Sequence, residues 1–559
     1  MRPGDNEPSA AYADFFRDEF AREASACFET AVQNSGIDCQ ANAVLAAELH
    51  KLIKNYNDGS SRKKRWLWSL IGSIAVVVIW LLVLINSDDP SALNWVLFCL
   101  AAAGTVFLGI KAIPILKHLS EMLAELEAVI EEKRAVAEAQ LAPLYNFFTW
   151  NTISQLIEKV MPDFKFDKFL SREREADMRE NFDLEVPDNE NNTVLAANSG
   201  SFFGYPFILA DIKDYEWVEK IWTGELEISW VERVRNSDGS YSRETRHETL
   251  RANIERPAPQ FNRYAMCFFG HEAAPHLSFS RAPSMLSGMD GFFGGLGKKV
   301  KLGFLHRKEQ NLSDGNQFTM MSNRDFEALF SAVDRDHEIE FRMLFTPLAQ
   351  QYMVKLLNDK KHGYGDDFSF HKGGKAICLT PRHLNDIDVD DPPFFTHEFD
   401  LQKVRELFNE RATEYFRTIY FTFAPLMAIP LYTEPRLEQE VCRLPENPAI
   451  SRCELETAVN SIGTARFAHR ESILDDILKI RNFRDHGTHV TATVCAVGFR
   501  GEDHLEYVSC LGGDGNWHDV PVPWVEYIPV QRDTEVRACH AGDLPADAEC
   551  FCRRSIAVE

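Results

Sequence analysis

Hydrophobic and polar positions divide the chain sharply near its beginning. Residues 66–85 form a run of 20 residues without a charge, and a second apolar run, 93–115, follows a short polar link, Asn86-Ser-Asp-Asp-Pro-Ser91. At about 1.5 Å per residue, a 20-residue helix matches a hydrocarbon core of about 30 Å. The pattern therefore predicts a transmembrane helical hairpin.

Basic residues lie at both outer ends of this hairpin, and Lys111 and Lys117 are those that close the second span. Arg62, Lys63, Lys64 and Arg65 precede the first span, whereas the link at 86–91 has no Lys or Arg. By the positive-inside rule both ends of the hairpin face the cytoplasm, and both termini with them. The four basic residues, together with Trp66 and Trp95, are the predicted membrane-anchoring residues. The first residues lack a basic-then-apolar leader, so we expect an uncleaved anchor.

Small residues recur every four positions in both spans, at Ser69 and Ser73, then at Ala101, Thr105 and Gly109. Such stripes let helices approach closely. We expect the hairpin to pack on itself. Self-association into a homo-oligomer through these helices, or a pore, stays open, although no ionisable residue lies at mid-membrane depth.

Helical periodicity continues on both sides of the hairpin. Residues 12–32 place Phe16, Phe20 and Phe28 on one side of a helix, which predicts packing against the chain's own cytosolic part or contact with the membrane surface. Residues 119–144 predict a helical stalk. Its interrupted heptad gives a short coiled-coil signal through Leu119, Met122, Leu126, Val129 and Val136.

From about residue 195 the pattern becomes mixed α+β. Alternation at 226–234 and 241–250, around the turn Asn236-Ser-Asp-Gly239, predicts a β-hairpin. Residues 337–345 predict a strand, Thr346-Pro347 starts a helix, and 401–420 predicts another. In the tail, 472–480 predicts a helix, and short β-like stretches at 489–499, 505–510, 520–530, 535–539 and 549–553 predict an antiparallel sheet.

The predicted fold class is an α+β membrane protein in five parts. These are an N-terminal cytosolic helical segment (1–60), the transmembrane hairpin (66–116), a helical stalk (117–185), an α+β cytosolic domain (195–435) and a small β-rich C-terminal domain (440–559).

Several stretches carry a family resemblance. They are Asn323-Arg-Asp-Phe-Glu-Ala-Leu-Phe330, residues 334–350, Tyr415-Phe-Arg-Thr-Ile-Tyr420 and residues 424–432. Over about residues 60–435 the chain resembles uncharacterised bacterial membrane proteins with two transmembrane helices and a cytosolic domain of unknown function. The resemblance implies a multi-pass protein of the bacterial inner membrane, and it carries no activity, cofactor or catalytic residue.

Motifs that suggest chemistry are incomplete. His486-Gly-Thr-His489 matches the histidine motif of subtilisin-like proteases, but the aspartate and serine motifs are missing. His271 and His276 are five apart with a proline between them, whereas zinc ligation on one helix face needs a spacing of four. The glycine-rich segment 288–303 lacks the P-loop spacing. Its Phe292, Phe293, Lys298 and Lys299 instead predict a loop that contacts anionic headgroups.

The chain has 12 cysteines, which should stay thiols on the cytosolic side. Cys539, His540, Cys550 and Cys552 could make a four-ligand zinc site, since thiolates and imidazole suit tetrahedral zinc. No other cofactor is expected.

The charge balance limits the classes of function that fit the chain. Lys and Arg number 60 against 84 Asp and Glu, a formal net charge of −24 that excludes broad nucleic-acid binding. Most of the acidity lies beyond residue 117, so anionic lipid should repel most of that region. We expect a membrane-anchored cytosolic binding or scaffold protein with a protein partner. The alternatives are a membrane-bound hydrolase with dispersed catalytic residues and an oligomeric pore or effector.

Overall fold

The computed structural model describes residues 7–85, 92–145, 147–148, 150–184, 186–235, 241–283, 321, 323–332, 334–389, 398–441, 448–540, 551–553 and 556–558. The chain forms two compact units, which are described separately. The helical unit comprises residues 22–149 and 393–412, and the sheet unit comprises residues 1–21, 150–392 and 413–559. The predicted mixture of helices and sheets is confirmed.

The helical unit is built on two long helices, α3 (Cys39–Ile85) and α4 (Ala92–Tyr145), each long and apolar enough to cross a membrane. They lie antiparallel. The Thr105 hydroxyl donates to the Ser73 carbonyl at 3.3 Å, and Lys63 Nζ donates to Ser120 Oγ at 3.2 Å. The predicted small-residue stripes therefore meet within the hairpin.

The charged end of α4 packs through part of the predicted set of residues. Met122 and Val136 are half exposed, whereas the neighbouring Leu123 and Ala137 are buried, and Leu119, Leu126 and Val129 are partly buried. The predicted heptad is therefore displaced by one residue at Met122 and Val136 only. Ala137 packs in a cluster with Ala46, Leu49 and Phe399.

The N-terminal phenylalanines pack on aromatic residues of the same chain, as predicted. They lie on a π-helical turn (Tyr12–Phe16) after α1 (Pro8–Ala11), and on α2 (Arg17–Ser35). In the sheet unit Phe20 stacks on Phe416 with ring centroids 4.2 Å apart, and in the helical unit Phe28 stacks on Phe148 at 5.5 Å.

A seven-stranded antiparallel sheet forms the centre of the sheet unit, in the order β1-β2-β3-β4-β7-β6-β5. Its strands are β1 (Phe164–Phe166), β2 (Asn192–Phe202), β3 (Tyr205–Arg235), β4 (Tyr241–Gly270), β5 (Ser278–Arg281), β6 (Phe368–Gly373) and β7 (Ala376–Pro381). The predicted hairpin at 226–250 is confirmed as the outer part of β3 and β4, which are far longer than predicted.

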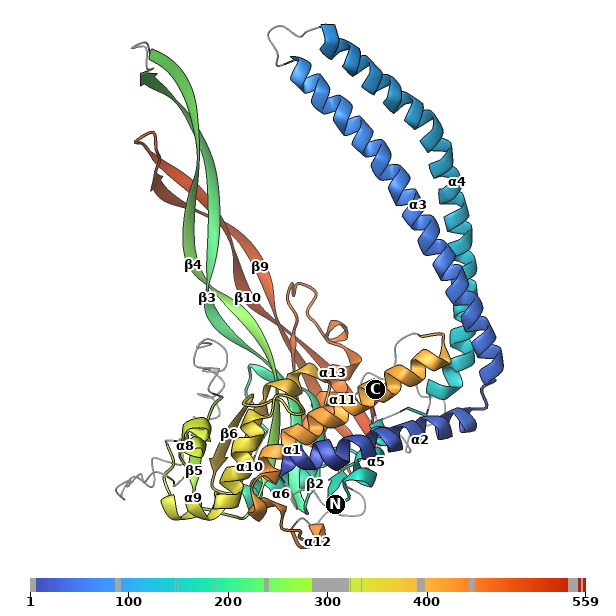
Figure 1. The fold of residues 1–559 in the computed structure, drawn as a ribbon. Helices are drawn as coiled ribbons and strands as arrows, with labels where there is room; N and C mark the ends of the chain where they lie inside the picture. The colour runs from blue at the N-terminus through green and yellow to red at the C-terminus, as the bar shows by residue number, and fades with distance from the viewer. Residues whose placement is uncertain are drawn as a thin grey trace. The chain divides into compact units, whose positions relative to one another are not determined.

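The remaining helices are short apart from one (Figure 1). They are α5 (Trp150–Val160), α6 (Arg172–Phe182), α8 (Arg324–Phe330), α9 (Glu338–Leu344), α10 (Pro347–Asn358), α11 (Leu401–Met427), α12 (Glu438–Val441) and α13 (Arg452–Ile462). Thr346 caps α10, as predicted, by accepting a hydrogen bond from the Ala349 amide at 3.3 Å. The predicted helix at 401–420 is confirmed and extends to Met427.

The strand predicted at 337–345 is wrong, because this segment forms α9. His337 is its N-cap, and Nδ1 accepts from the Glu340 amide at 3.2 Å. The alternation that suggested a strand does not match the burial. Ile339 and Met343 are exposed, whereas Phe341, Leu344 and Phe345 are fully buried, which is the spacing of a helix face.

A second, five-stranded antiparallel sheet has the order β11-β12-β10-β9-β8. Its strands are β8 (Ile477–Asp485), β9 (Val490–Leu511), β10 (Trp517–His540), β11 (Phe551–Arg553) and β12 (Ile556–Val558). The predicted tail sheet is confirmed, but four of its five predicted stretches join into two long strands, β9 and β10, and the fifth overlaps β11. The helix predicted at 472–480 is wrong, since buried Ile477, Leu478 and Ile480 belong to β8.

A buried carboxylate joins the two sheets. Glu456 on α13 accepts the Val194 amide of β2 at 2.8 Å and lies 3.6 Å from Lys479 Nζ of β8. Burial raises the pKa of Glu456, and the Lys479 charge opposes that rise. Thr193 of β2 also donates to the Leu478 carbonyl at 2.6 Å. The long hairpins of the two sheets therefore have a common base.

Candidate functional site: a paired-ribbon arm

Two β-ribbons extend from the sheets of this unit, and they lie side by side (Figure 1). Pairing of β3 with β2 ends at Asp214, and pairing of β9 with β8 ends at Val497. Beyond these residues β3 pairs only with β4, and β9 only with β10, among the strands described. We call residues 215–235, 241–261, 498–511 and 517–530 the arm.

The base of the arm is an aromatic contact between the ribbons. The Phe499 ring of β9 lies 5.1 Å from the Tyr215 ring and 5.4 Å from the Trp217 ring of β3, and 6.2 Å from Phe261 of β4. All four of these residues have odd numbers, so on each strand they lie on one face.

The outer contact between the ribbons uses the opposite faces. It contains Trp222, Leu226, Ile228, Leu250, Ala252 and Ile254 from the first ribbon, and Val508, Cys510, Val520, Val522 and Trp524 from the second. Every one of these residues has an even number. Because strands twist right-handedly, each ribbon turns its other face to its neighbour along its length. The two ribbons therefore coil around each other.

One glycine permits this approach. A Cβ at Gly224 would lie 2.1 Å from the Pro521 carbonyl oxygen of the other ribbon, which no side chain could accommodate without a backbone shift. The end of the second ribbon also touches the first. The Gly513 amide donates to a Glu248 carboxylate oxygen at 2.6 Å.

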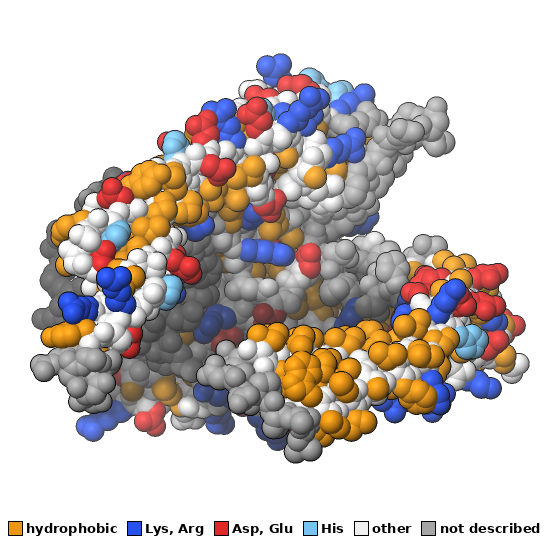
Figure 2. Space-filling model, turned by 90° about the horizontal axis from the view of Figure 1, so that it is seen from above, with side chains coloured by type: hydrophobic (Ala, Val, Ile, Leu, Met, Phe, Trp, Pro, Cys, Tyr) orange, Lys and Arg blue, Asp and Glu red, His pale blue; other side chains and the backbone are white. Residues whose placement is uncertain are grey.

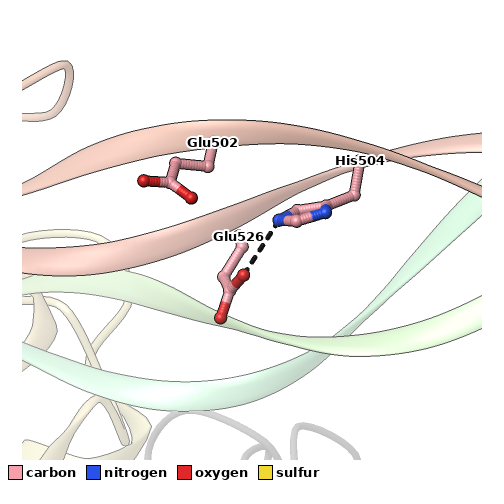
Figure 3. Close-up of side chains that lie close together, drawn as sticks. All are labelled: Glu502, His504 and Glu526. Atoms are coloured by element: carbon pink, nitrogen blue, oxygen red, sulfur yellow. Dashed lines mark ion pairs between the residues drawn. The ribbon is translucent and has the colours of Figure 1, made fainter.

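A cluster of ionisable side chains lies between the two contacts. Glu502 and His504 of β9 and Glu526 of β10 place one ligand atom each within 4.8 Å of one another, as Figure 3 shows. The register places Glu502 directly opposite Glu526, and His504 opposite Trp524, whose ring it stacks on at 4.7 Å. All three ionisable side chains are exposed.

This cluster has the donors for a divalent cation, one imidazole nitrogen and two carboxylates, a set that zinc and similar metals accept. Its groups also have protein partners. His504 Nε2 lies 2.9 Å from Glu526, and Arg500 donates to Glu502 at 2.7 Å. These contacts offset the repulsion between the two opposed carboxylates. The geometry alone therefore indicates an exposed ion-pair network.

The body of the sheet unit holds a second group, which is buried. The His271 ring lies 3.9 Å from the Tyr205 ring and 4.8 Å from the Tyr432 ring, measured between ring centroids, and is tilted to both. Burial lowers the pKa of His271 to about 3 and that of nearby Lys372 to about 7. Lys372 Nζ donates to the Gly374 carbonyl at 2.5 Å. His276 is exposed and pairs with Glu340 at 2.7 Å, so the two histidines do not form one site.

An acid, a histidine and a hydroxyl also meet in the core. Asp367 lies 2.6 Å from His383 Nδ1, and Thr422 Oγ1 lies 3.3 Å from His383 Nε2. These are the residue types of a hydrolytic triad. Thr422, however, is fully buried and donates to the Thr418 carbonyl at 2.8 Å, so no substrate reaches its oxygen.

A shallow depression of about 560 Å³ lies between α1 and α10. Two of its three carboxylates, Glu7 and Asp359, accept backbone hydrogen bonds. Glu7 accepts the Ser9 and Ala10 amides, and Asp359 accepts the His362 amide at 3.0 Å. These bonds make the two carboxylates caps of local backbone turns.

The structure describes the side chains of two of the four predicted zinc ligands, Cys539 and His540. Cys539 and His540 are neighbours on β10 and point to opposite faces of the sheet. Residues 539 and 552 both pair with Ala557 of β12, from opposite sides, so their backbones are two strand spacings apart. Cys550 and the side chain of Cys552 lie outside the described residues.

The remaining residues singled out in the sequence are the protease-like histidines, the predicted headgroup loop and the predicted membrane-anchoring residues. His486 and His489 close the exposed turn between β8 and β9, where the His486 amide donates to the His489 carbonyl at 2.9 Å. The predicted headgroup loop, Phe292, Phe293, Lys298 and Lys299, lies outside the described residues. Arg62, Lys64 and Arg65 are exposed on α3, Lys63 and Trp66 are half-buried there, and Trp95 is exposed on α4.

The cluster of Glu502, His504 and Glu526 was missed in the sequence. Its signal is a spacing of two along β9, which places side chains on the same strand face, but the third member depends on the β9–β10 register. A spacing of two between charged residues is common in exposed strands and carries little information by itself.

Comparison with known proteins does not assign the chain to a family. No protein-family model matches it, and no curated protein or solved structure is significantly similar to it. The resemblance to bacterial two-span membrane proteins stays a prediction.

Lys372 should make stability depend on pH. Its folded pKa is lowered from 10.5 to about 7, so between these values the unfolded chain binds the extra proton and stability rises with pH. The slope is at most about 1.4 kcal/mol per pH unit. We expect Lys372→Met to flatten the unfolding free energy between pH 7 and 10 relative to Lys361→Met, which removes an exposed lysine. Equal slopes in both variants would contradict the assignment.

Gly224→Ala should loosen the arm. The new Cβ collides with the Pro521 carbonyl, and such overpacking costs about 1–3 kcal/mol. We expect faster proteolysis within residues 498–530. Thr223→Ala is the control, because its side chain lies on the other face and bonds Asn253 within the same ribbon. Equal cleavage rates would show that the ribbons do not pack at Gly224.

Proposed function

We propose that the chain is a membrane-anchored binding or scaffold protein, in which α3 and α4 are the anchor and the arm is the binding element. The observation that carries the proposal is an apolar stripe on the arm. Leu505, Tyr507, Leu511 and Trp517 lie on the odd-numbered face of the second ribbon, and each is more than half exposed.

This stripe lies on the face opposite the ribbon–ribbon contact, so packing within the arm leaves it uncovered. Leu511 lies directly opposite Trp517, and Tyr507 directly opposite Pro521. The hydrogen-bonded pair Ser509 and Asp519 lies between these two pairs on the same face. Exposed apolar side chains that include Tyr and Trp, with polar groups among them, are typical of protein–protein interfaces. A protein partner is therefore the occupant that we propose for it.

The anchor is supported by the exposure of the two long helices. In the most apolar stretch of α3 no residue is buried, and in that of α4 only 6% are. Ile79, Leu82, Phe107 and Ile110 are each about two-thirds exposed. Figure 2 shows hydrophobic side chains gathered over these helices. The core helix of a soluble protein would be buried, so the surface suits lipid.

The flanking charges support an orientation. Arg62, Lys64 and Arg65 form an exposed basic group at one end of the apolar stretch of α3. We therefore place both termini in the cytoplasm, in a multi-pass protein of the bacterial inner membrane.

The hydrolase alternative gains no support from the described residues, because the acid–histidine–hydroxyl group at His383 is closed to substrate. A homo-oligomer through the spans remains compatible with this proposal.

Reporter fusions test the anchor. Fusions at residues 60, 90 and 559 should report cytoplasmic, external and cytoplasmic locations, because the basic flanks stay inside. A cytoplasmic signal at 90 would mean that the hairpin does not cross the membrane, and an external signal at 559 would reverse the orientation.

In-cell cross-linking with mass spectrometry tests the arm. The full chain should give cross-links to a partner from the second ribbon, and Tyr507→Ser with Trp517→Ser should reduce them at least tenfold. Ile221→Ser is the matched control, since Ile221 is similarly exposed on the first ribbon. Partner cross-links that survive the double substitution would contradict the binding role of the stripe.

A further inference from the structure

The first ribbon has a tip that extends beyond its contact with the second. The turn after β9 touches the first ribbon at Glu248 and Trp230. Past that point β3 and β4 continue as a two-stranded ribbon, through Val231–Arg235 and Tyr241–Thr245. Figure 1 shows this longer ribbon extending past the other.

The two faces of the tip differ in charge. On the even-numbered face Glu232 lies opposite Glu244, and Arg246 bridges both, at 3.1 Å and 3.9 Å. The odd-numbered face has Arg233 directly opposite Arg243. From residues 229 to 235 and 241 to 247, no acidic residue lies on that odd face.

Over these described strand residues the odd face therefore has positive charge with no carboxylate beside it on the same face. Like charges directly opposite each other destabilise a β-ribbon. Next to this pair are two exposed apolar side chains, Val231 and Tyr241, which are 62% and 56% exposed. The Arg233 guanidinium lies over the Tyr241 ring at 4.2 Å, which keeps the charge beside the aromatic surface.

We propose that this face of the tip binds an anionic phospholipid surface. Arginine donates to phosphate oxygens in a planar fork, and tyrosine and valine fit the boundary between headgroups and acyl chains. The inference rests on the membrane anchoring proposed above, because an anchored chain is held at a high local concentration of anionic headgroups. The tip is a basic exception in a chain of net charge −24.

The lengths of the parts, each taken separately, permit this contact. At about 3.3 Å per residue the ribbon from Tyr215 to Arg235 is about 70 Å long. At about 1.5 Å per residue the part of α4 after its apolar stretch is about 45 Å long. The ribbon is therefore longer than the helical stalk.

The test uses the full chain in lipid nanodiscs, with the photoreactive residue p-benzoylphenylalanine in place of Tyr241. Discs contain phosphatidylcholine alone or a mixture with phosphatidylglycerol. We expect lipid adducts in the mixed discs and about 30-fold fewer in the neutral discs, because each of the two arginines contributes roughly a fivefold effect near an anionic surface. The photoreactive residue in place of Ile221, on the same face nearer the base, should give no lipid adduct.

Charge variants complete the test. Arg233→Glu with Arg243→Glu should abolish the adducts, whereas Arg233→Lys with Arg243→Lys should keep most of them. Lys220→Glu with Arg251→Glu makes the same change in net charge elsewhere on the ribbon and should have no effect. Adducts to protein alone, equal yields in both discs, or yields unchanged by the charge reversal would overturn the proposal. A chain that fails to co-elute with disc lipid would instead refute the membrane anchor.

Discussion

The contact between the two β-ribbons is the constraint on which the arm depends. An isolated two-stranded ribbon is at best marginally stable in water, because it has one apolar face and nothing to cover it. Here Leu250, Ala252 and Ile254 of one ribbon cover Val520 and Val522 of the other. Each ribbon therefore supplies the apolar layer that the other lacks, and the outer faces of both become available for binding.

This arrangement also separates functions along the arm. Twist moves the ribbon–ribbon contact from odd-numbered residues at Phe499 to even-numbered residues at Val522. The opposite face of the second ribbon then carries the apolar stripe, and the ribbon that extends further carries the arginine pair. Protein and lipid contacts are thus proposed for different ribbons, and the common base joined through Glu456 holds both on one unit.

Sequence patterns predicted the elements whose stability is local. The two long apolar helices and the Thr346 cap each depend on neighbouring residues. The strand at 337–345 failed because Ile339 and Met343 alternate with buried Phe341 yet remain exposed in α9. The length of β9 and β10, and the cluster of Glu502, His504 and Glu526, could not be predicted, because both depend on cross-strand register and on the distant partner ribbon.

The most direct test of the paired-ribbon arm is a double-mutant cycle between its two halves, with Leu250→Ala in one ribbon and Val522→Ala in the other. Unfolding free energies of the full chain would be measured for the wild type, both single variants and the double variant. Because residues in one packed cluster interact, we expect a coupling energy of about 0.5 kcal/mol or more. Strictly additive effects would contradict the account, since they would mean that the ribbons do not stabilise each other.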